Sequence, residues 1–233
     1  HQLQLGFLKM LKGSAIRNES LKYGYKFREY PPYEILGNEF LSYEDIVKLK
    51  RIEEVLERYY NSARFERSLK YIINGFFDSP FEFFEEFSLF YLKEGCFERS
   101  ISSRELYTIL LKFIAESNRK VDLTLLNELL KFDFLISDNT NNLPVGIERI
   151  FKESFKTKCF EFLKTSDNIA KFLPDFCGEP PKKIFNRVHF ELFRYNITEN
   201  VSIPTKKDTV ILFNYSEKNP ITEHYSYIKI QLP

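Results

Sequence analysis

The chain has 233 residues, of which 43% are hydrophobic and 17% aromatic, and its 34 basic and 33 acidic side chains give a formal net charge of +1. This composition excludes a disordered chain, because disordered segments are poor in apolar and aromatic residues. The near-zero charge argues against a protein that binds polyanions through bulk charge. No uncharged apolar run approaches the roughly 18 residues that a membrane span needs.

The only methionine is Met10, and residue 1 is His. Residues 1–7 lack the basic region and the apolar run of a signal peptide. They could be the remnant of a tag before a complete protein. We expect instead a fragment of a longer protein, because a regular sequence pattern begins at once.

The first 24 residues predict a strand, a turn and a helix. Leu3, Leu5 and Phe7 alternate with polar or small residues, which is the period of a strand. Ser14 can cap a short helix that extends to Gly24. A lone strand and helix cannot bury both of their faces, so we expect this segment to belong to a sheet whose other strands are missing.

Residues 25–41 predict an irregular linker with some strand character. Pro31 and Pro32 exclude a helix there, because proline lacks the backbone N–H and holds the preceding residue in an extended conformation. The linker ends where Ser42 and Asp45 resemble a capping box, with Asp in the place of the usual Glu.

After Ser42, apolar residues recur at spacings of three and four, which predicts one apolar helix face. They are Ile46, Leu49, Ile52, Leu56, Tyr60 and Ala63. Asn61 and Ser62 favour a helix poorly, so we expect a kink or break there. A second helix should then end near Phe76.

The strongest local signal is the sequence SPFE at residues 79–82, with Ser as N-cap, Pro as first helical residue and Glu as the third. The helix that follows can end at Gly95. Further helices are predicted over 102–118, 122–135, 144–163 (strongest from residue 147) and 168–173.

Beyond residue 178 the apolar period changes from helical to alternating, which predicts three strands. They cover 188–197, 209–215 and 225–232, and a small antiparallel sheet fits them. The chain as a whole therefore predicts an α+β fold, mainly a helical bundle, with a strand and helix at its N-terminus and a small antiparallel β-sheet at its C-terminus.

No motif for nucleotide or metal binding stands out. There is no Gly-rich phosphate loop and no dinucleotide fingerprint. Cys96, Cys159 and Cys177 lack the spacing of zinc or iron–sulfur ligands, so we interpret them as reduced, partly buried cysteines.

His189 and Glu191 are two residues apart, on one face of a predicted strand, and His224 lies on or near a neighbouring strand. Imidazoles so placed can bind a metal, but the ligand count is short, so a partly buried His with a hydrogen-bond partner is favoured. The pairs Glu53-Glu54 and Glu85-Glu86 do not share a site, since adjacent helical residues point about 100° apart.

Residues 48–67 mix basic side chains with Tyr59 and Tyr60, a pattern that can bind nucleic acid. Interleaved glutamates favour a salt-bridged helix surface instead. The phenylalanines of residues 81–90 are interpreted as core, with an apolar partner groove as the alternative. The residues alone therefore indicate a module without a catalytic centre of its own.

Four segments together resemble the C-terminal region of cobalamin-binding radical SAM proteins, in the branch that ends in an uncharacterised C-terminal domain. They are LQLGFLKMLKGSAI at 3–16, KYGYKFREYPPYE at 22–34, LSYEDIVKLKRIEEVLERYYN at 41–61 and NRVHFE at 186–191. Such proteins are often described as Fe–S oxidoreductases, or as similar to the anaerobic magnesium-protoporphyrin monomethyl ester cyclase. The resemblance covers most of the chain.

The resemblance implies a parent with a cobalamin-binding domain, followed by a partial barrel that holds a [4Fe–4S] cluster on CxxxCxxC. It implies that residues 1–24 are the last strand and helix of that barrel, 25–41 a linker, 42–178 a helical domain and 179–233 a small sheet packed on it. The cluster motif and the cobalamin domain are absent from this sequence, so the fragment itself should hold no cofactor and no metal.

In that family a Gly-Thr/Ser turn follows the last barrel strand, near the place where SAM binds. Gly13-Ser14 matches this turn, and Met10 and Leu11 precede it. The resemblance implies that they lie near SAM in the intact parent, and a plain strand-to-helix turn is the alternative. No residue of the fragment is predicted to be catalytic.

The favoured function is an accessory domain, scaffold or substrate-side, of a cytoplasmic cobalamin-dependent radical SAM enzyme. Its partners would be the upstream radical SAM and cobalamin-binding domains of the same chain. One alternative is a non-catalytic module that recognises RNA or a protein through the C-terminal sheet or a helical groove, although the net charge disfavours nucleic acid. Another is a stand-alone helical interaction protein.

Overall fold

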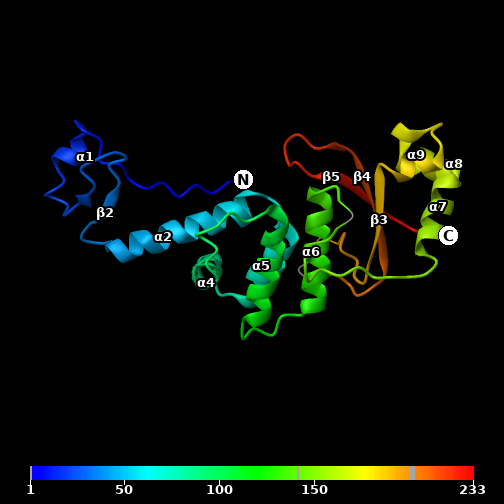
Figure 1. Ribbon diagram of the computed structural model, residues 1–233, viewed down its shortest axis with the longest axis horizontal. Coiled ribbons are helices and arrows are strands. Elements are labelled where there is room, and N and C mark those ends of the chain that lie inside the picture. Colours follow the sequence, from blue (N-terminus) through cyan, green and yellow to red (C-terminus); the bar gives the residue numbers. More distant parts are fainter. Residues whose placement is uncertain (1, 141, 200–202) are drawn as a thin grey trace. The chain divides into compact units, whose positions relative to one another are not determined.

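The computed structural model describes residues 2–140, 142–199 and 203–233, and its chain divides into two compact units. Unit 1 comprises His1–Ser62 and Ser79–Ser100, and unit 2 comprises Ala63–Asp78 and Ile101–Pro233. The fold is α+β, as the sequence predicts: helices accompany two small antiparallel sheets, of two and three strands in the described residues (Figure 1).

Unit 1 is built on two packed helices, α2 (Tyr43–Leu56) and α4 (Pro80–Lys93). A π-helical turn, Glu57–Asn61, follows α2. The helical stretch ends after Asn61, where the sequence predicts a kink or break. Aromatic rings join the two helices: the ring centroids of Tyr59 and Phe87 are 4.7 Å apart. The phenylalanine stripe of α4 is therefore core, and most of its rings are buried.

Both helices begin at the predicted caps. The Ser42 side chain accepts a hydrogen bond from the Asp45 N–H, and the Asp45 carboxylate accepts one from the Ser42 N–H. At α4 the Ser79 hydroxyl accepts from the Glu82 N–H, and Pro80 occupies the first helical position. These contacts satisfy N–H groups that have no partner within the helix.

The N-terminal part of unit 1 differs from the prediction. It contains α1 (Ala15–Asn18), β1 (Lys26–Phe27) and β2 (Ile35–Gly37), but no strand forms over residues 3–7. The backbone N–H and C=O of Leu3 instead bind the Asn61 side chain, both at 2.9 Å. The predicted strand is wrong here because alternation favours an extended backbone but supplies no partner strand.

In unit 2, one helix lies between two other helices on one side and a sheet on the other (Figure 1). The central helix is α6 (Leu123–Ser137), which contacts α3 (Glu66–Phe76) and α5 (Ser103–Glu116). Three strands form the predicted small antiparallel sheet: β3 (Val188–Phe193), β4 (Thr209–Lys218) and β5 (Tyr225–Ile230). Their order in the sheet is β3-β4-β5.

Helices cover both faces of this sheet. On the α6 side, the Phe132 ring lies 6.1 Å from that of Phe193. On the other side, the Phe162 ring lies 5.8 Å from that of Phe190. The second layer consists of α7 (Phe155–Lys164), α8 (Ser166–Phe172), a 3-10 turn (Pro174–Phe176) and α9 (Pro181–Phe185). Residues 144–154, by contrast, form no helix, so the helix predicted to begin at 144 begins at 155.

The physical reason lies at Gly146, whose φ of +86° does not belong to a right-handed helix. Its carbonyl accepts from the Asn127 side chain at 2.6 Å, and the Glu148 N–H donates to the same side chain at 3.1 Å. The segment therefore satisfies its backbone against α6 rather than within itself.

Candidate functional site

The turn at residues 10–14 is the site that the sequence predicts. Met10 is fully buried, and its N–H donates to the Tyr33 carbonyl at 2.7 Å. The Met10 carbonyl accepts from Arg17 Nη1 at 2.8 Å, and the Arg17 guanidinium lies 5.4 Å from the centre of the Tyr33 ring. Met10 thus anchors the turn, and its side chain is not available to a ligand in this structure.

The other three predicted residues form the accessible part of the turn. Gly13 has a φ of +84°, a conformation that glycine adopts without strain. The Ser14 hydroxyl donates to the Leu11 carbonyl at 2.7 Å and makes no capping bond to α1. Leu11 is 54% exposed. A molecule bound here would meet the Leu11 side chain and the backbone of the turn.

The segment that contains this turn exposes many apolar side chains. Among the described residues, nine of the twenty large hydrophobic side chains that are exposed lie within residues 3–43. We call them the N-terminal apolar set: Leu3, Leu8, Leu11, Leu21, Tyr23, Tyr30, Phe40, Leu41 and Tyr43. None of the residues of α1 is buried. This part of unit 1 therefore has little core of its own.

The same segment is basic. Residues 9–28 contain six cationic side chains and one acidic side chain, which gives a formal charge of +5 in a chain whose total is +1. The cations are Lys9, Lys12, Arg17, Lys22, Lys26 and Arg28, and the acid is Glu19. An apolar set within a basic segment is complementary to an apolar partner surface with acidic residues.

The predicted histidines do not meet. His189 Nε2 lies 2.8 Å from the Glu191 carboxylate, which confirms the interpretation of a partly buried His with a partner. His224 precedes β5, and its Nε2 lies 3.1 Å from the Ala63 carbonyl. Burial lowers the pKa of His224. In the parts of the chain that the structure describes, no three His, Cys, Asp or Glu side chains come together as a metal site.

The cysteines agree with their interpretation as ordinary thiols. Cys96 and Cys159 are buried and Cys177 is exposed, and none of the three forms a disulfide. Burial raises the pKa of the Cys159 thiol to about 12, so it stays protonated at neutral pH and is a poor nucleophile.

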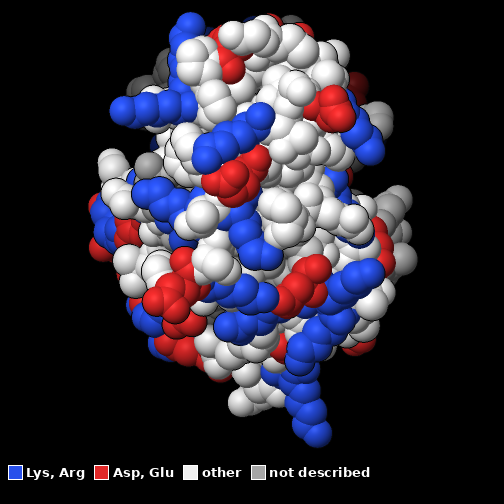
Figure 2. Space-filling model, turned by 90° about the vertical axis from the view of Figure 1, so that its right-hand side faces the viewer, with Lys and Arg blue, Asp and Glu red and all other residues white. Residues whose placement is uncertain are grey.

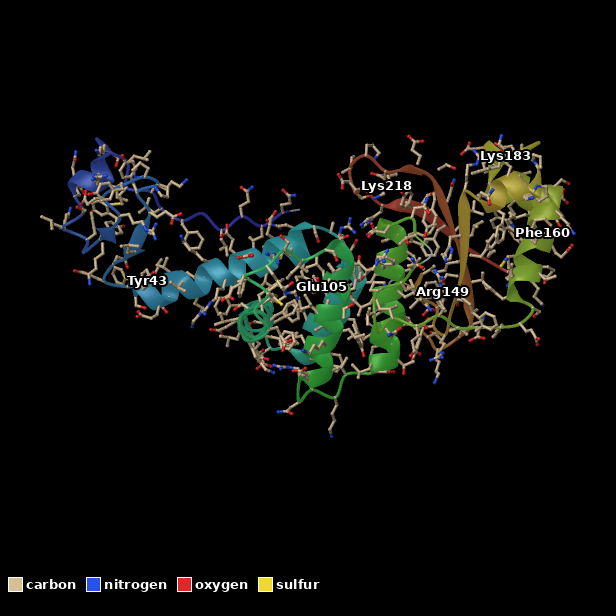
Figure 3. The ribbon with its side chains drawn as sticks, viewed as in Figure 1. Tyr43, Glu105, Arg149, Phe160, Lys183 and Lys218 are labelled. Atoms are coloured by element: carbon tan, nitrogen blue, oxygen red, sulfur yellow. The ribbon has the colours of Figure 1, made fainter. Side chains whose placement is uncertain are left out.

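Sequence reasoning missed a buried charged cluster between α6 and β3. The Lys131 ammonium is fully buried; it contacts the carboxylates of Glu128 at 3.2 Å and Glu191 at 3.8 Å, and donates to the Leu192 carbonyl at 3.1 Å. Arg149, labelled in Figure 3, comes from the loop after α6, and its Nε donates to Glu191 at 3.1 Å. The signal in the sequence was a pair of opposite charges, three residues apart, within a largely apolar helix.

The pKa values of the two carboxylates of this cluster are shifted in opposite directions. Burial raises the pKa of Glu128 because the attraction of Lys131 does not compensate for desolvation. For Glu191, burial works in the same direction, but the hydrogen bond from His189 and the charges of Lys131 and Arg149 outweigh it and lower the pKa. Paired carboxylates of this kind occur in catalytic sites. Here Glu128 and Glu191 are each only 3% exposed, so the arrangement supports packing between α6 and β3.

The comparisons with known proteins identify one family. Its model, described as "Protein of unknown function (DUF4080)", matches residues 21–213. No curated protein and no solved structure matches the chain. In the described residues, no helix has the length and apolar character to cross a membrane. The family match covers most of the sequence, including parts of both units, and the chain therefore belongs to the DUF4080 family of proteins of unknown function.

Proposed function

We infer that the chain is an accessory domain of a cobalamin-dependent radical SAM enzyme, which it supports without performing the chemistry. The observation that carries this proposal is the N-terminal apolar set. A concentration of exposed apolar side chains in one segment commonly marks an interaction site, because leaving apolar surface in water is unfavourable. Five of its nine side chains lie within residues 1–24, whose sequence resembles the last strand and helix of the radical SAM barrel, and the DUF4080 family is associated with cobalamin radical SAM proteins.

The proposal assigns the cofactors to other domains. The described residues do not fit a [4Fe–4S] cluster, because the three cysteines are far apart in sequence and no group of metal-binding side chains converges. We derive no catalytic step from this chain. Its part would be to cover the barrel, with Leu11, Gly13 and Ser14 placed at the side where SAM binds.

The first test is the reading frame that contains this chain. The proposal expects a CxxxCxxC motif upstream of His1, and its absence would overturn the proposal. The second test is amide hydrogen exchange on the full-length protein and on residues 1–233 alone. The proposal expects slower exchange across residues 3–43 in the full-length protein, because the upstream domain would cover this segment.

Matched variants sharpen the test. In the full-length protein, Leu21→Ser and Phe40→Ser alter side chains that are 96% and 88% exposed, so the fold of unit 1 should persist. The proposal expects faster exchange over residues 3–43 and less cleavage of SAM to 5′-deoxyadenosine, at unchanged cluster absorbance. Phe151→Ser and Ile221→Ser, which are 93% and 90% exposed in unit 2, are the controls. Equal effects in both pairs would contradict the proposal.

A further inference from the structure

We propose that a cavity in unit 2 binds an organic anion with an apolar body, such as an alkyl phosphate or carboxylate. The cavity has a volume of about 540 Å³. Small-molecule sites commonly measure roughly 300–1,000 Å³. Three segments that are distant in sequence form it, at residues 152–158, 207–210 and 229–232, together with Leu192. This inference does not depend on the proposed function, and the two can fail separately.

The charged part of the lining is strongly one-sided. Four lysines line the cavity, Lys152, Lys158, Lys207 and Lys229, against one acid, Asp208. Figure 2 shows Lys and Arg side chains gathered over the middle and lower part of the face that carries α7 to α9, with acidic side chains among them. A cavity with this lining attracts anions, because low-dielectric walls concentrate the field of the ammonium groups.

Two of these lysines, Lys152 and Lys229, have partners that a ligand can replace, whereas Lys158 donates to the Pro233 carbonyl oxygen at 2.5 Å. Lys152 lies 2.6 Å from the Asp208 carboxylate, but both side chains are more than half exposed, so water screens the pair. Lys229 donates to the Asn196 amide oxygen at 3.1 Å, which is a neutral partner. An ammonium group has three donors, so each lysine can keep such a contact and still bind an anion.

The floor of the cavity is apolar. Phe155, Val210 and Leu232 are partly buried and pack against the core cluster between the sheet and α7 to α9, and Ile230 belongs to that cluster. Solvent still reaches these side chains at the cavity. A hydrocarbon or aromatic group would cover them while an anionic head group contacts the lysines, and this combination defines the ligand class.

The position of α7 also favours the binding of an anion. The helix begins at the cavity with Ser154 and Phe155, and the Ser154 side chain makes no capping hydrogen bond. The positive end of the helix dipole therefore adds to the four ammonium groups.

The test titrates the chain calorimetrically with octyl phosphate, octanol and inorganic phosphate. The proposal expects octyl phosphate to bind at least about tenfold more tightly than either of the others, because only it supplies both the anion and the apolar body. Equal binding of octanol and octyl phosphate would overturn it. Flotation with phosphatidylglycerol vesicles, against phosphatidylcholine vesicles, distinguishes a lipid head group from a soluble anion as the source of the same chemistry.

Charge-reversing variants locate the site. Lys152→Glu and Lys207→Glu should each weaken octyl phosphate binding about tenfold, the loss of one charge-assisted contact. The control is Lys182→Glu, which makes the same change of charge at an exposed residue of α9 outside the cavity. This variant should bind octyl phosphate as tightly as the unmodified chain does. Equal weakening by Lys182→Glu would show bulk charge attraction and overturn the proposal. Circular dichroism monitors folding, and Lys207→Gln, a milder change, should weaken binding even if a charge reversal disturbs the fold.

Discussion

The Asp133 carboxylate on α6 caps the N-terminus of α3 by accepting two hydrogen bonds from Ser68, 65 residues away in sequence: one from its N–H at 2.9 Å and one from its hydroxyl at 2.6 Å. The second carboxylate oxygen accepts from the Arg67 N–H at 3.3 Å. The residue before α3 is Phe65, which has no side-chain acceptor. A distant acid therefore satisfies the first N–H groups of α3 and ties two helices together.

Replacing Asp133 by alanine should lower the free energy of unfolding by about 2–3 kcal/mol, because buried donors lose their acceptor. Asp133→Asn keeps one acceptor oxygen and should cost less. The measurement is urea unfolding followed by circular dichroism at neutral pH. Asp175→Ala removes an exposed acid and serves as the control. Equal urea midpoints for Asp133→Ala and Asp175→Ala would contradict the capping role.

The same residue predicts a pH dependence of stability. Burial raises the pKa of Asp133 from 3.8 to about 7, since desolvation outweighs the hydrogen bonds from Ser68 and Arg67. Between these two values the folded state holds a proton that the unfolded state has released, so this contribution to stability is full below pH 3.8 and is lost as the pH rises to about 7. The difference in unfolding free energy between the unmodified chain and Asp133→Asn should fall across this window. A difference that does not change with pH would refute the assignment.

In the buried cluster, the effects on stability of changing Lys131 and Glu128 should depend strongly on one another. Lys131→Met leaves two buried carboxylates without the ammonium between them and should cost about 3–5 kcal/mol. Adding Glu128→Gln removes one of these charges and should recover part of the loss. A double-mutant cycle by urea unfolding measures the coupling, and strictly additive effects would show that the two groups do not interact.

In unit 1, the hydroxyl groups of Tyr59 and Tyr91 lie 2.8 Å apart within the aromatic cluster. Tyr59→Phe removes this buried hydrogen bond and should cost about 1–2 kcal/mol. The double variant with Tyr91→Phe should cost less than the sum of the single variants. Thermal unfolding measures the effect, and Tyr30→Phe, at an 80% exposed position, should leave the midpoint unchanged.

Features decided by a few neighbouring residues could be predicted from the sequence. The caps at Ser42 and Ser79 involve donors three residues away, and the break after Asn61 reflects local helix preferences. The three strands of the C-terminal sheet and their antiparallel arrangement also followed from alternation and short spacing. In the candidate site, the turn at Gly13 was predictable, whereas its place near SAM stays a prediction, as does the division of the chain at residues 24, 41 and 178.

Features that depend on distant partners could not be predicted. The alternation of Leu3, Leu5 and Phe7 is consistent with an extended backbone, yet the polar groups of Leu3 bind a side chain rather than a strand. In the sequence, Asp133 cannot be told apart from an aspartate on the protein surface. It caps α3 only because α3 packs against α6. The cluster around Lys131 likewise needs β3 beside α6.

The boundaries of the two units have a consequence for their inheritance and engineering. The polypeptide passes from one unit to the other at residues 62–63, 78–79 and 100–101, so neither unit is a continuous stretch of chain. A single cut removes α3 from its partners in unit 2 or α4 from its partner α2 in unit 1. The two units should therefore be exchanged, duplicated or fused between proteins only together, and a stop codon within residues 62–100 should leave neither of them complete.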